Sequence, residues 1–447
     1  MKPPLAPEPF SKLLIEHHKS FSEILQSCNS PTVSGRYLHW DEIRQRPPPA
    51  ELTHEQWWLG IKLARNSQQH ELPYVKGSDG RPFFFLLPDR VVEGLHRIDR
   101  QMAGTIGVPE STGKPAVPDR FIVNSLIQEA ITSSKLEGAS TTRAEAVDML
   151  RSGRRPRDRS ERMIVNNYRA MQIVRELTGQ PLSPDGVLHL HKTITAGTLD
   201  DPVDAGRIQE PGEKRVYVSD PTGRRVLHHP PPAKELDKRI HQMLRLANRE
   251  DTDKKFIHPV IRAIALHFLL AYDHPFVDGN GRTARALFYW SMLQSGYWLF
   301  EFISISRYLV EAPSRYARSF LYTESDDNDL TYFISLQVEL ILRAIEDLER
   351  YIAKKTAQIE AVENMLRRAP GFNHRQLSLL AHGLRTPNAR YTIRSHQTSH
   401  SVANGTARSD LLNLVERGLL ERRPSDGRRF EFLVPPDLEQ RIRTLRR

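Results

Sequence analysis

The chain has 447 residues, more than the roughly 250–300 at which a single hydrophobic core stops growing, so two or three domains are expected. Hydrophobic residues make up 39% and charged residues 26%, values that exclude a disordered or fibrous chain. The formal net charge of +10 is compatible with nucleic-acid binding, with an acidic partner, or with no special partner.

The sequence shows none of the usual marks of a secreted or membrane protein. The first residues, MKPPLAPEPF, lack the apolar run of a signal peptide, and no stretch approaches the roughly 18 apolar residues of a membrane span. Cys28 is the only cysteine, which excludes an intramolecular disulfide and a cysteine-based metal site. We therefore expect a cytoplasmic protein that does not bind a membrane.

The N-terminal region, residues 1–115, has elements without an evident role. Helical patterns cover 8–27 and 51–69, and a polar segment that ends in three prolines separates them. A short strand is predicted over 81–87 and a helix over 91–102.

Residues 116–330 are expected to form a mainly helical domain. A helix is predicted over 119–136, where apolar residues recur every three or four positions before the stop signal at Gly138. One hairpin interrupts the helical pattern, with strands over 214–219 and 224–227 around a turn. Further helices are predicted over 159–177, 184–194, 233–247, 258–272 and 281–295.

The C-terminal end carries most of the excess charge. Residues 367–447 contain 16 Arg, no Lys and 7 acidic residues. A long polar helix over roughly 329–367 is expected in a connecting segment, 331–370. In the domain that follows, 371–447, helices are predicted over 374–383, 392–400 and 404–416, with a closing hairpin over 419–434. Three helices and a hairpin resemble a winged helix-turn-helix domain.

The segment from His274 to Arg285, HPFVDGNGRTAR, is the most informative part of the chain. It places a glycine loop between two helices, an arrangement whose main-chain N–H groups and positive helix end favour an anion such as phosphate. Arg282 and Arg285 are three positions apart, so they share a helix face and can both bind one polyphosphate.

Two side chains of this segment have reactive chemistry. Asp278 supplies a hard oxygen of the kind that Mg²⁺ uses when it shares its ligands with nucleotide and water. His274 is suited to act as a general base for a hydroxyl group, because an imidazole ordinarily titrates at about pH 6.5.

The segment resembles the Fic family signature, His-x-Phe-x-Asp/Glu-Gly-Asn-Gly-Arg-x-x-Arg. All eight specified positions match: His274, Phe276, Asp278, Gly279, Asn280, Gly281, Arg282 and Arg285. The resemblance implies a protein adenylyltransferase, in which His274 deprotonates a Tyr, Thr or Ser hydroxyl of a target protein, or of the enzyme itself. That hydroxyl then attacks the α-phosphate of ATP and releases pyrophosphate.

The resemblance also implies how the nucleotide is held. Asp278 would hold Mg²⁺, and the amides of 279–282 together with Asn280 would cradle the phosphates. Arg282 would stabilise charge on the leaving group. Phe276 would pack inward and fix the loop. Transfer of another nucleotide or of phosphocholine stays open, because the loop binds phosphates rather than a base.

A second segment, Ser133 to Gly138, resembles the family's inhibitory motif, Ser/Thr-x-x-x-Glu-Gly/Asn. By resemblance, Glu137 pairs with Arg285 and denies that guanidinium to the γ-phosphate of ATP, so the resting enzyme is slow. Glu137 could instead position a water that removes AMP from a modified protein, and the sequence does not separate the two roles.

The 214–227 hairpin lies where the family has its flap, a strand edge that pairs with an extended segment of the target. Val216 and Tyr217 are the candidate contacts, and a merely solvated hairpin is the other interpretation. In the C-terminal domain, the 404–416 helix would be the recognition helix. The wing turn would be flanked by Arg422, Arg423, Arg428 and Arg429. Winged helices bind either DNA or protein, so both partners stay open.

The sequence thus predicts a mainly α protein with a Fic-type helical core, a hairpin flap and a C-terminal winged helix. We expect an autoinhibited protein adenylyltransferase that uses ATP and Mg²⁺. A DNA-binding regulator with a secondary Fic core is the alternative from a different functional class, and intact His274 and Asp278 favour the enzyme.

Overall fold

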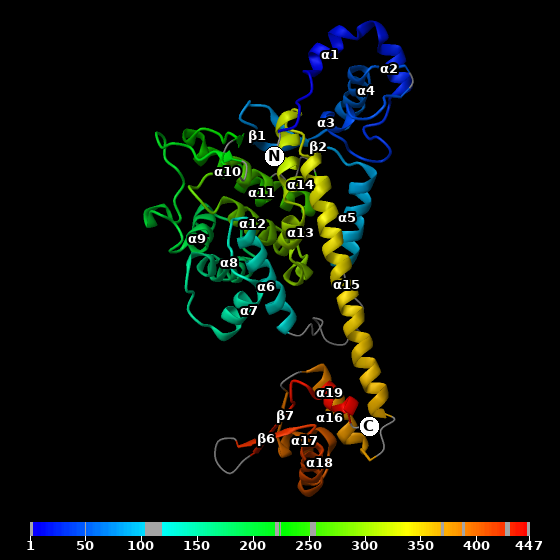
Figure 1. The fold of residues 1–447 in the computed structure, drawn as a ribbon, viewed down its shortest axis with the longest axis vertical. Helices are drawn as coiled ribbons and strands as arrows, with labels where there is room; N and C mark the ends of the chain where they lie inside the picture. The colour runs from blue at the N-terminus through cyan, green and yellow to red at the C-terminus, as the bar shows by residue number, and fades with distance from the viewer. Residues whose placement is uncertain are drawn as a thin grey trace. The chain divides into compact units, whose positions relative to one another are not determined.

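The computed structural model describes the chain except residues 1–2, 50, 103–118, 220–222, 224, 251–255, 368–370, 387–388, 425–429 and 445–447. The described residues form two compact units, 1–346 and 347–447. The protein is mainly helical, as predicted, and its described strands form small antiparallel sheets (Figure 1). None of the described helices combines the length and the apolar character needed to cross a membrane.

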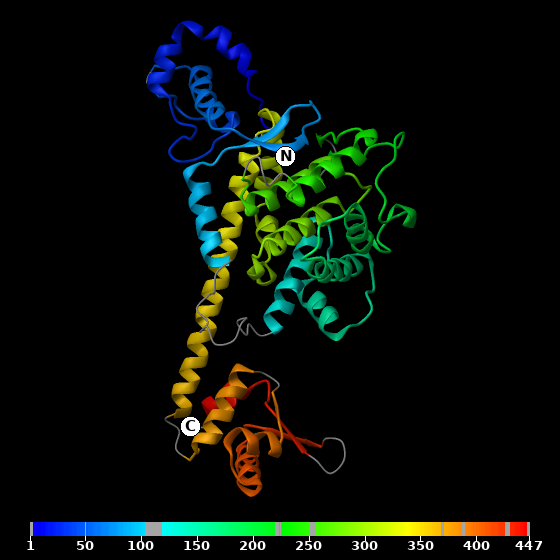
Figure 2. The ribbon, with the colours of Figure 1, turned by 180° about the vertical axis from the view of Figure 1, so that it is seen from behind.

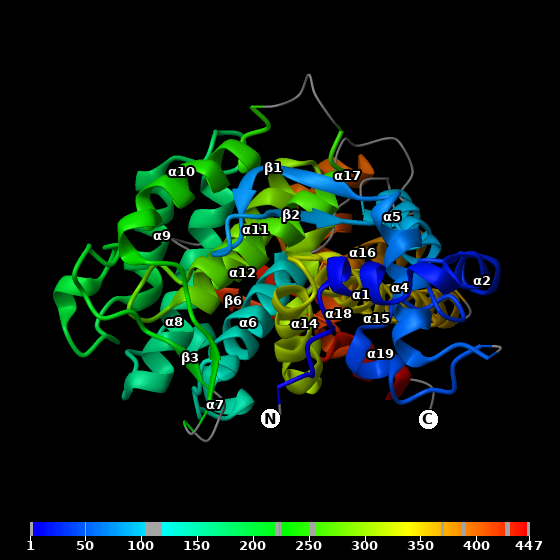
Figure 3. The same cartoon turned by 90° about the horizontal axis from the view of Figure 1, so that it is seen from above.

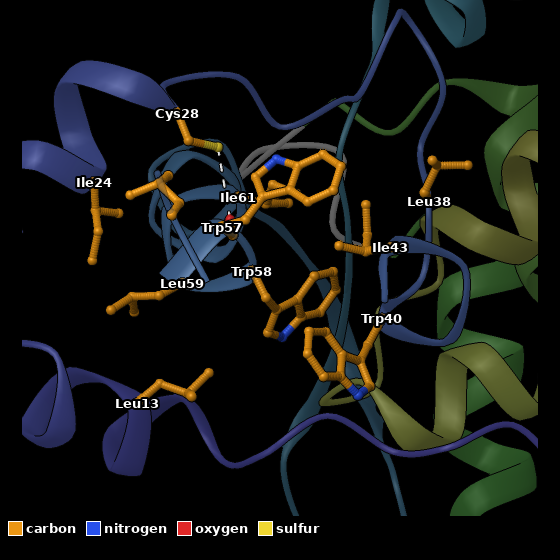
Figure 4. Close-up of a cluster of buried hydrophobic side chains, with 11 residues drawn as sticks. Leu13, Ile24, Cys28, Leu38, Trp40, Ile43, Trp57, Trp58, Leu59 and Ile61 are labelled. Carbon is orange, nitrogen blue, oxygen red and sulfur yellow. Dashed lines mark hydrogen bonds between the residues drawn. The ribbon is translucent and has the colours of Figure 1, made fainter. Parts of the chain in front are cut away.

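The N-terminal residues fold into a small helical cluster around the buried Trp58 (Figure 4). Trp40 packs against Trp58, with 6.0 Å between ring centroids. Cys28 is also buried here, and its Sγ donates to the Trp57 carbonyl. Because burial raises the pKa of the thiol, Cys28 stays protonated and unreactive. The predicted 8–27 helix is broken at 17–20. The helices are α1 (Phe10–Glu16), α2 (Phe21–Ser27), α3 (Trp40–Ile43) and α4 (His54–Asn66).

A hairpin and a helix join this cluster to the rest of the unit. Strand β1 (His70–Lys76) pairs with β2 (Pro82–Phe85), and the hairpin crosses over α11 (Pro259–Asp273) in Figure 3. Phe83 of β2 meets Phe268 of α11 edge-on at 5.4 Å between ring centroids. The following helix, α5 (Asp89–Met102), lies along α15 (Thr331–Arg367), as Figures 1 and 2 show.

Two helices at the centre of the unit hold the glycine loop between them. Nearly every residue of α11 and of α12 (Asn280–Gln294) is buried, because both helices carry apolar side chains on all faces. Around them lie α6 (Asp119–Leu136), α8 (Arg159–Glu176), α9 (Pro184–Thr195), α10 (Leu236–Ala247), α13 (Ile305–Glu311) and α14 (Pro313–Ser325). Helix α7 (Arg143–Ser152) packs on α6 and α8. Short 3-10 helices cover His18–Ser20, Pro202–Asp204, Ala233–Glu235 and Trp298–Phe302.

The long helix α15 begins inside this core rather than as a polar connector. Phe333 is fully buried and lies 4.7 Å from Phe320 and 5.3 Å from Phe268 between ring centroids. Residues 331–346 therefore belong to the first unit, because their apolar face completes its core.

The predicted flap hairpin is present but shorter than expected. Strand β3 (Val218–Ser219) pairs with β4 (Val226–His228). Residues 214–217 were predicted as part of the first strand and instead form irregular structure. Contacts of Arg215, described below, hold this segment against the end of α11.

The second unit is a small sheet packed by helices. The predicted helices are present as α16 (His374–Arg385), α17 (Ile393–His400) and α18 (Asn404–Glu416), and β6 (Glu421–Pro424) pairs with β7 (Phe430–Leu433). Two elements were not predicted: β5 (Arg390–Tyr391), which pairs with the other edge of β7, and α19 (Leu438–Thr444). Leu380, Leu411, Leu414 and Phe432 lie in their shared core.

Candidate functional site

The loop between α11 and α12 depends on two residues with left-handed backbone. His274 ends α11 at φ 48° and ψ 52°, and Gly279 precedes α12 at φ 87°. A Cβ atom on Gly279 would lie 2.7 Å from the Thr195 methyl group, so both the backbone angle and the available space require glycine there. This turn brings His274 and the start of α12 into one site.

His274 is held as a neutral base. Its Nδ1 donates to the Ala271 carbonyl at 3.2 Å, which leaves the lone pair on Nε2 as the acceptor. Burial lowers the pKa of His274 to about 4, and the nearby Glu137 carboxylate opposes that change. The imidazole is therefore uncharged at neutral pH and free to accept a proton at Nε2.

Asn280 and His191 fix the shape of the loop. The Asn280 side chain accepts from the Phe276 N–H at 2.9 Å and donates to the Phe276 carbonyl at 2.8 Å. The Phe276 ring stacks on the His191 ring, with 3.7 Å between centroids. The side chain of Asn280 thus forms hydrogen bonds within the loop, and these contacts hold the loop backbone in one conformation.

His191 also holds the backbone of Asp278. Its Nε2 donates to the Asp278 carbonyl at 2.8 Å, and its Nδ1 accepts from the Gly206 N–H at 3.0 Å. Burial lowers the pKa of His191 to about 4, which keeps this neutral tautomer. Sequence reasoning missed His191, because it lies on α9, more than 80 residues before the loop, and no local motif marks it.

Asp278 is the exposed acid of the site. Its Oδ1 accepts from the Gly279 N–H, while Arg159 Nη2 lies 3.6 Å from Oδ2 and Arg282 Nη2 lies 3.6 Å from Oδ1. The described residues contain no cluster of three or more metal-ligating side chains here or elsewhere. A divalent cation at Asp278 would therefore need ligands from a bound phosphate and water, as Mg²⁺ commonly does.

Arg282 is a buried cation with free donors. Its side chain is fully buried and Nη1 donates to the Ile194 carbonyl at 3.2 Å, whereas Nε and Nη2 have no hydrogen-bond partner among the described residues. A buried guanidinium with unpaired N–H groups is costly unless an anion binds it. This is the feature that best fits a phosphate ligand at the loop.

The Arg285 guanidinium donates hydrogen bonds to Ser133 on α6 and to Glu137, which follows that helix. Its Nε donates to Ser133 Oγ at 2.8 Å, and its Nη2 donates to the Ser133 carbonyl at 3.0 Å and to Glu137 Oε1 at 2.8 Å. A Cβ atom on Gly281 would overlap the same Glu137 oxygen. The Glu137 carboxylate therefore covers the first turn of α12, where helix N–H groups favour an anion.

The flap is joined to the site by Arg215. Its Nη2 donates to the carbonyls of Asp273 at 2.6 Å and His274 at 3.0 Å, and its Nε donates to the Pro231 carbonyl at 2.9 Å. A cation at the C-terminal end of α11 also complements the helix dipole. The predicted contact residues lie next to it: Val216 is half-buried, and Tyr217 is exposed and meets His229 edge-on.

His228 anchors the returning strand of the hairpin. Its Nε2 lies 2.6 Å from the Tyr272 carbonyl, and its Nδ1 lies 2.7 Å from Glu324 Oε2. His228 thus fixes the base of this hairpin to α11 and α14. His258 and His267 are likewise held by Asp99 and Tyr316.

The predicted DNA-contacting arginines belong to the second unit and not to this site. Arg422 stacks on Phe430, and Arg423 is exposed and 3.5 Å from Glu421. Arg428 and Arg429 lie outside the described residues.

Residues 181–292 match the Fic/DOC family, and the matched segment contains the entire loop from His274 to Arg285. Among curated proteins, the chain is similar to protein adenylyltransferase Fic of Nematostella vectensis, with 30% identity over 118 residues, which is 26% of this chain and 24% of that protein. It is similar to protein adenylyltransferase fic-1 of Caenorhabditis elegans, with 37% identity over 116 residues, which is 26% of this chain and 20% of that protein. The chain thus spans about a quarter or less of the length of these curated relatives.

Two solved structures are similar at low sequence identity. A Fic family protein from Desulfovibrio desulfuricans G20 is 16% identical, with 77% of this chain and 95% of that chain covered and a TM-score of 0.49. A Fic-1 fragment from Caenorhabditis elegans is 22% identical, with 59% and 71% covered and a TM-score of 0.46.

Proposed function

We propose that this chain, which carries a Fic/DOC domain over residues 181–292, transfers AMP from ATP to a hydroxyl group of a protein. One observation carries the proposal: the loop combines the neutral base His274 with the buried Arg282, whose Nε and Nη2 have no hydrogen-bond partner in the described part of the chain. The first suits a hydroxyl nucleophile and the second suits a phosphate. The named activity of the relatives from Nematostella vectensis and Caenorhabditis elegans agrees with this pairing.

The chemical step follows from the free Nε2 of His274. Nε2 takes the proton of a Tyr, Thr or Ser hydroxyl as its oxygen forms a bond to the α-phosphorus of ATP. The bond between that phosphorus and the oxygen bridging to the β-phosphate breaks, and pyrophosphate leaves. Arg282 stabilises the negative charge that builds on the leaving group.

Asp278 is the residue that would hold Mg²⁺ together with the nucleotide. Its exposed carboxylate and the absence of other clustered ligands in the described residues suit an ion that takes most of its ligands from phosphate and water. When bound, the ion supplies neutralisation of phosphate charge.

Glu137 acts as an inhibitor in this proposal. Its carboxylate bonds Arg285 and covers Gly281, so it occupies the place of an anion at the start of α12. Ser133 accepts from Nε and Nη2 of the same guanidinium. With Arg285 occupied, the terminal phosphate of ATP loses a ligand, and the α-phosphate is not aligned for attack.

The flap is the surface that would receive the target. Arg215 fixes the base of the hairpin to the carbonyl of His274, so a segment that pairs with the hairpin edge is placed beside the base. Such backbone pairing aligns a hydroxyl group while reading little of the target's sequence.

Transfer of a radioactive label tests the proposal. Wild type, Glu137→Gly and the double variant Glu137→Gly with His274→Ala are incubated with Mg²⁺ and ATP labelled at the α-phosphate. We expect protein labelling to appear with Glu137→Gly and to vanish in the double variant. Label from γ-labelled ATP would identify phosphoryl transfer instead, and undiminished labelling in the double variant would contradict His274 as the base.

A further inference from the structure

The first unit contains a cavity of about 540 Å³ that shares no lining residue with the site described above. Its walls come from four places in the chain: residues 35–42, the start of α5, the side of α14 and the first half of α15. Figures 1 and 2 show α5 running along α15 at this position. The N-terminal region, which the sequence left without a role, thus supplies two of the four walls.

The cavity carries an excess of positive charge. Its lining contains the glutamates Glu42, Glu93 and Glu339, and the arginines Arg36, Arg90, Arg97, Arg315 and Arg318. Three of the arginines are paired: Arg315 with Glu339 at 2.7 Å, Arg97 with Glu346 at 2.9 Å, and Arg36 with Glu42 at 3.7 Å.

Two of the arginines have no such partner. In the described part of the chain, neither Arg90 nor Arg318 forms an ion pair with a carboxylate. Arg90 lies against Gly35, and Arg318 lies beside the Tyr322 hydroxyl. Glu93 is exposed on α5 and offsets part of their charge, so the cavity suits one anionic group better than a polyanion.

The inner surface of the cavity is aromatic and apolar, with one unsatisfied hydroxyl. Tyr322, Tyr332 and Leu336 line it and are all buried. Ser335 lines it as well, and its buried Oγ has no hydrogen-bond partner in the described structure. A buried hydroxyl is normally bonded, so Ser335 has an unused hydrogen-bonding capacity in the cavity wall.

We propose that this cavity binds a small organic anion, an aromatic ring that carries a single phosphate or carboxylate group. The ring packs against Tyr322 and Leu336, the acidic group lies between Arg90 and Arg318, and Ser335 bonds a polar atom of the ring. The volume falls within the range of about 300–1,000 Å³ that small-molecule sites occupy, and an apolar interior with few polar groups is their usual lining.

Helix α14 connects this cavity to the candidate active site, so the ligand is an effector in the proposal. Arg318 and Tyr322 of α14 line the cavity, whereas Tyr316 and Glu324 of the same helix contact the active-site side. The Tyr316 hydroxyl bonds His267 at 2.8 Å and lies beside Arg285, and Glu324 bonds His228 at the flap base. The effector role rests on the proposed adenylyl transfer, whereas the binding itself does not.

Binding is measured first, by calorimetry on the full chain with Arg282→Met, which removes the guanidinium donors of Arg282 from the loop. The probes are phenyl phosphate, inorganic phosphate and phenol. We expect phenyl phosphate to bind more tightly than either part alone, and a double change, Arg90→Gln with Arg318→Gln, to weaken it by about tenfold or more. The control Arg169→Gln removes an exposed arginine on α8, outside the cavity, and should leave the affinity unchanged.

Equal affinity for inorganic phosphate, or an unchanged affinity in the double variant, would overturn the site. Thermal unfolding of each variant shows that it is folded before the comparison is made. The effector role is then tested by the labelling rate of Glu137→Gly with and without phenyl phosphate. The effector role is supported if phenyl phosphate changes the labelling rate of Glu137→Gly but not that of Glu137→Gly with the two cavity changes. It is contradicted if phenyl phosphate changes neither rate. In that case the calorimetry still decides whether the cavity binds the ligand.

Discussion

Arg285 donates to Glu137 Oε1 at 2.8 Å, and these two residues are 148 positions apart in the chain. The pair joins the residue that follows α6 to the first turns of α12, the helix that begins at the end of the glycine loop. Because Arg285 is buried, replacement of Glu137 leaves a guanidinium that needs another anion. In the proposed function, a bound phosphate would replace the carboxylate in this ion pair.

Removal of the charge alone should release part of the inhibition. In Glu137→Gln the amide oxygen can still accept from Arg285, but a hydrogen bond to a neutral acceptor is about half as strong as one to a carboxylate. We expect a labelling rate between those of wild type and Glu137→Gly, together with a lower KM for ATP than wild type. Initial rates over a series of ATP concentrations give both values. A rate for Glu137→Gln equal to that of wild type would show that bulk rather than charge blocks the site.

Arg282→Met should separate activity from stability. In the proposed reaction the substitution removes a donor to the leaving group, and loss of one such electrostatic group commonly costs about 10²–10³ in rate. It also removes a buried cation that donates one hydrogen bond within the described residues and lies 3.6 Å from Asp278, so the free energy of unfolding should be unchanged or raised. Labelling assays and thermal unfolding check the two effects. Marked destabilisation would mean that Arg282 holds the fold together instead.

His191 should act through the loop rather than on the substrate. In His191→Phe the stacking on Phe276 can persist, but the hydrogen bond to the Asp278 carbonyl is lost. We expect a lower kcat, with a larger effect at low Mg²⁺ concentration, because Asp278 is no longer fixed. His191→Gln can restore a donor and should recover part of the rate. An equal loss in both variants at every Mg²⁺ concentration would contradict this positioning role.

Acid should destabilise the protein before its carboxylates titrate. Burial lowers the pKa of His39, His191 and His274 to about 4, and that of His267 further. An unfolded histidine titrates at about 6.5, so between roughly pH 6.5 and 4 the unfolded chain binds more protons and stability falls as pH falls. Thermal unfolding between pH 7.5 and 5 measures this.

The lowered pKa of His274 also determines how the labelling rate should depend on pH. For Glu137→Gly the labelling rate should stay level as pH falls from 7.5 towards 6, because His274 remains neutral, and any loss at lower pH should follow unfolding. A steep loss of rate centred near pH 6.5 in a folded enzyme would show that His274 titrates as an ordinary imidazole.

Several elements could be predicted from the sequence because their signals are local. The 119–136 helix has its predicted bounds, and the helices on both sides of the glycine loop differ by only one residue at each end. Apolar periodicity, capping residues and the glycine at its end define a helix within a short window. The prediction of a strand over 214–217 was wrong, because Arg215 binds the end of α11 and holds this segment out of the hairpin.

The sequence by itself determined that one twelve-residue segment contains a base, an acid and two arginines around a glycine loop, because these residues are neighbours in the chain. Only the tertiary structure decided the protonation of His274 and the hydrogen bonding of Arg282. Burial makes His274 neutral and leaves two donors of Arg282 unpaired, and folding brings His191, Ser133 and Glu137 to the loop from α9 and α6. Solvation and long-range contacts depend on the whole packed core, so no local pattern contains them.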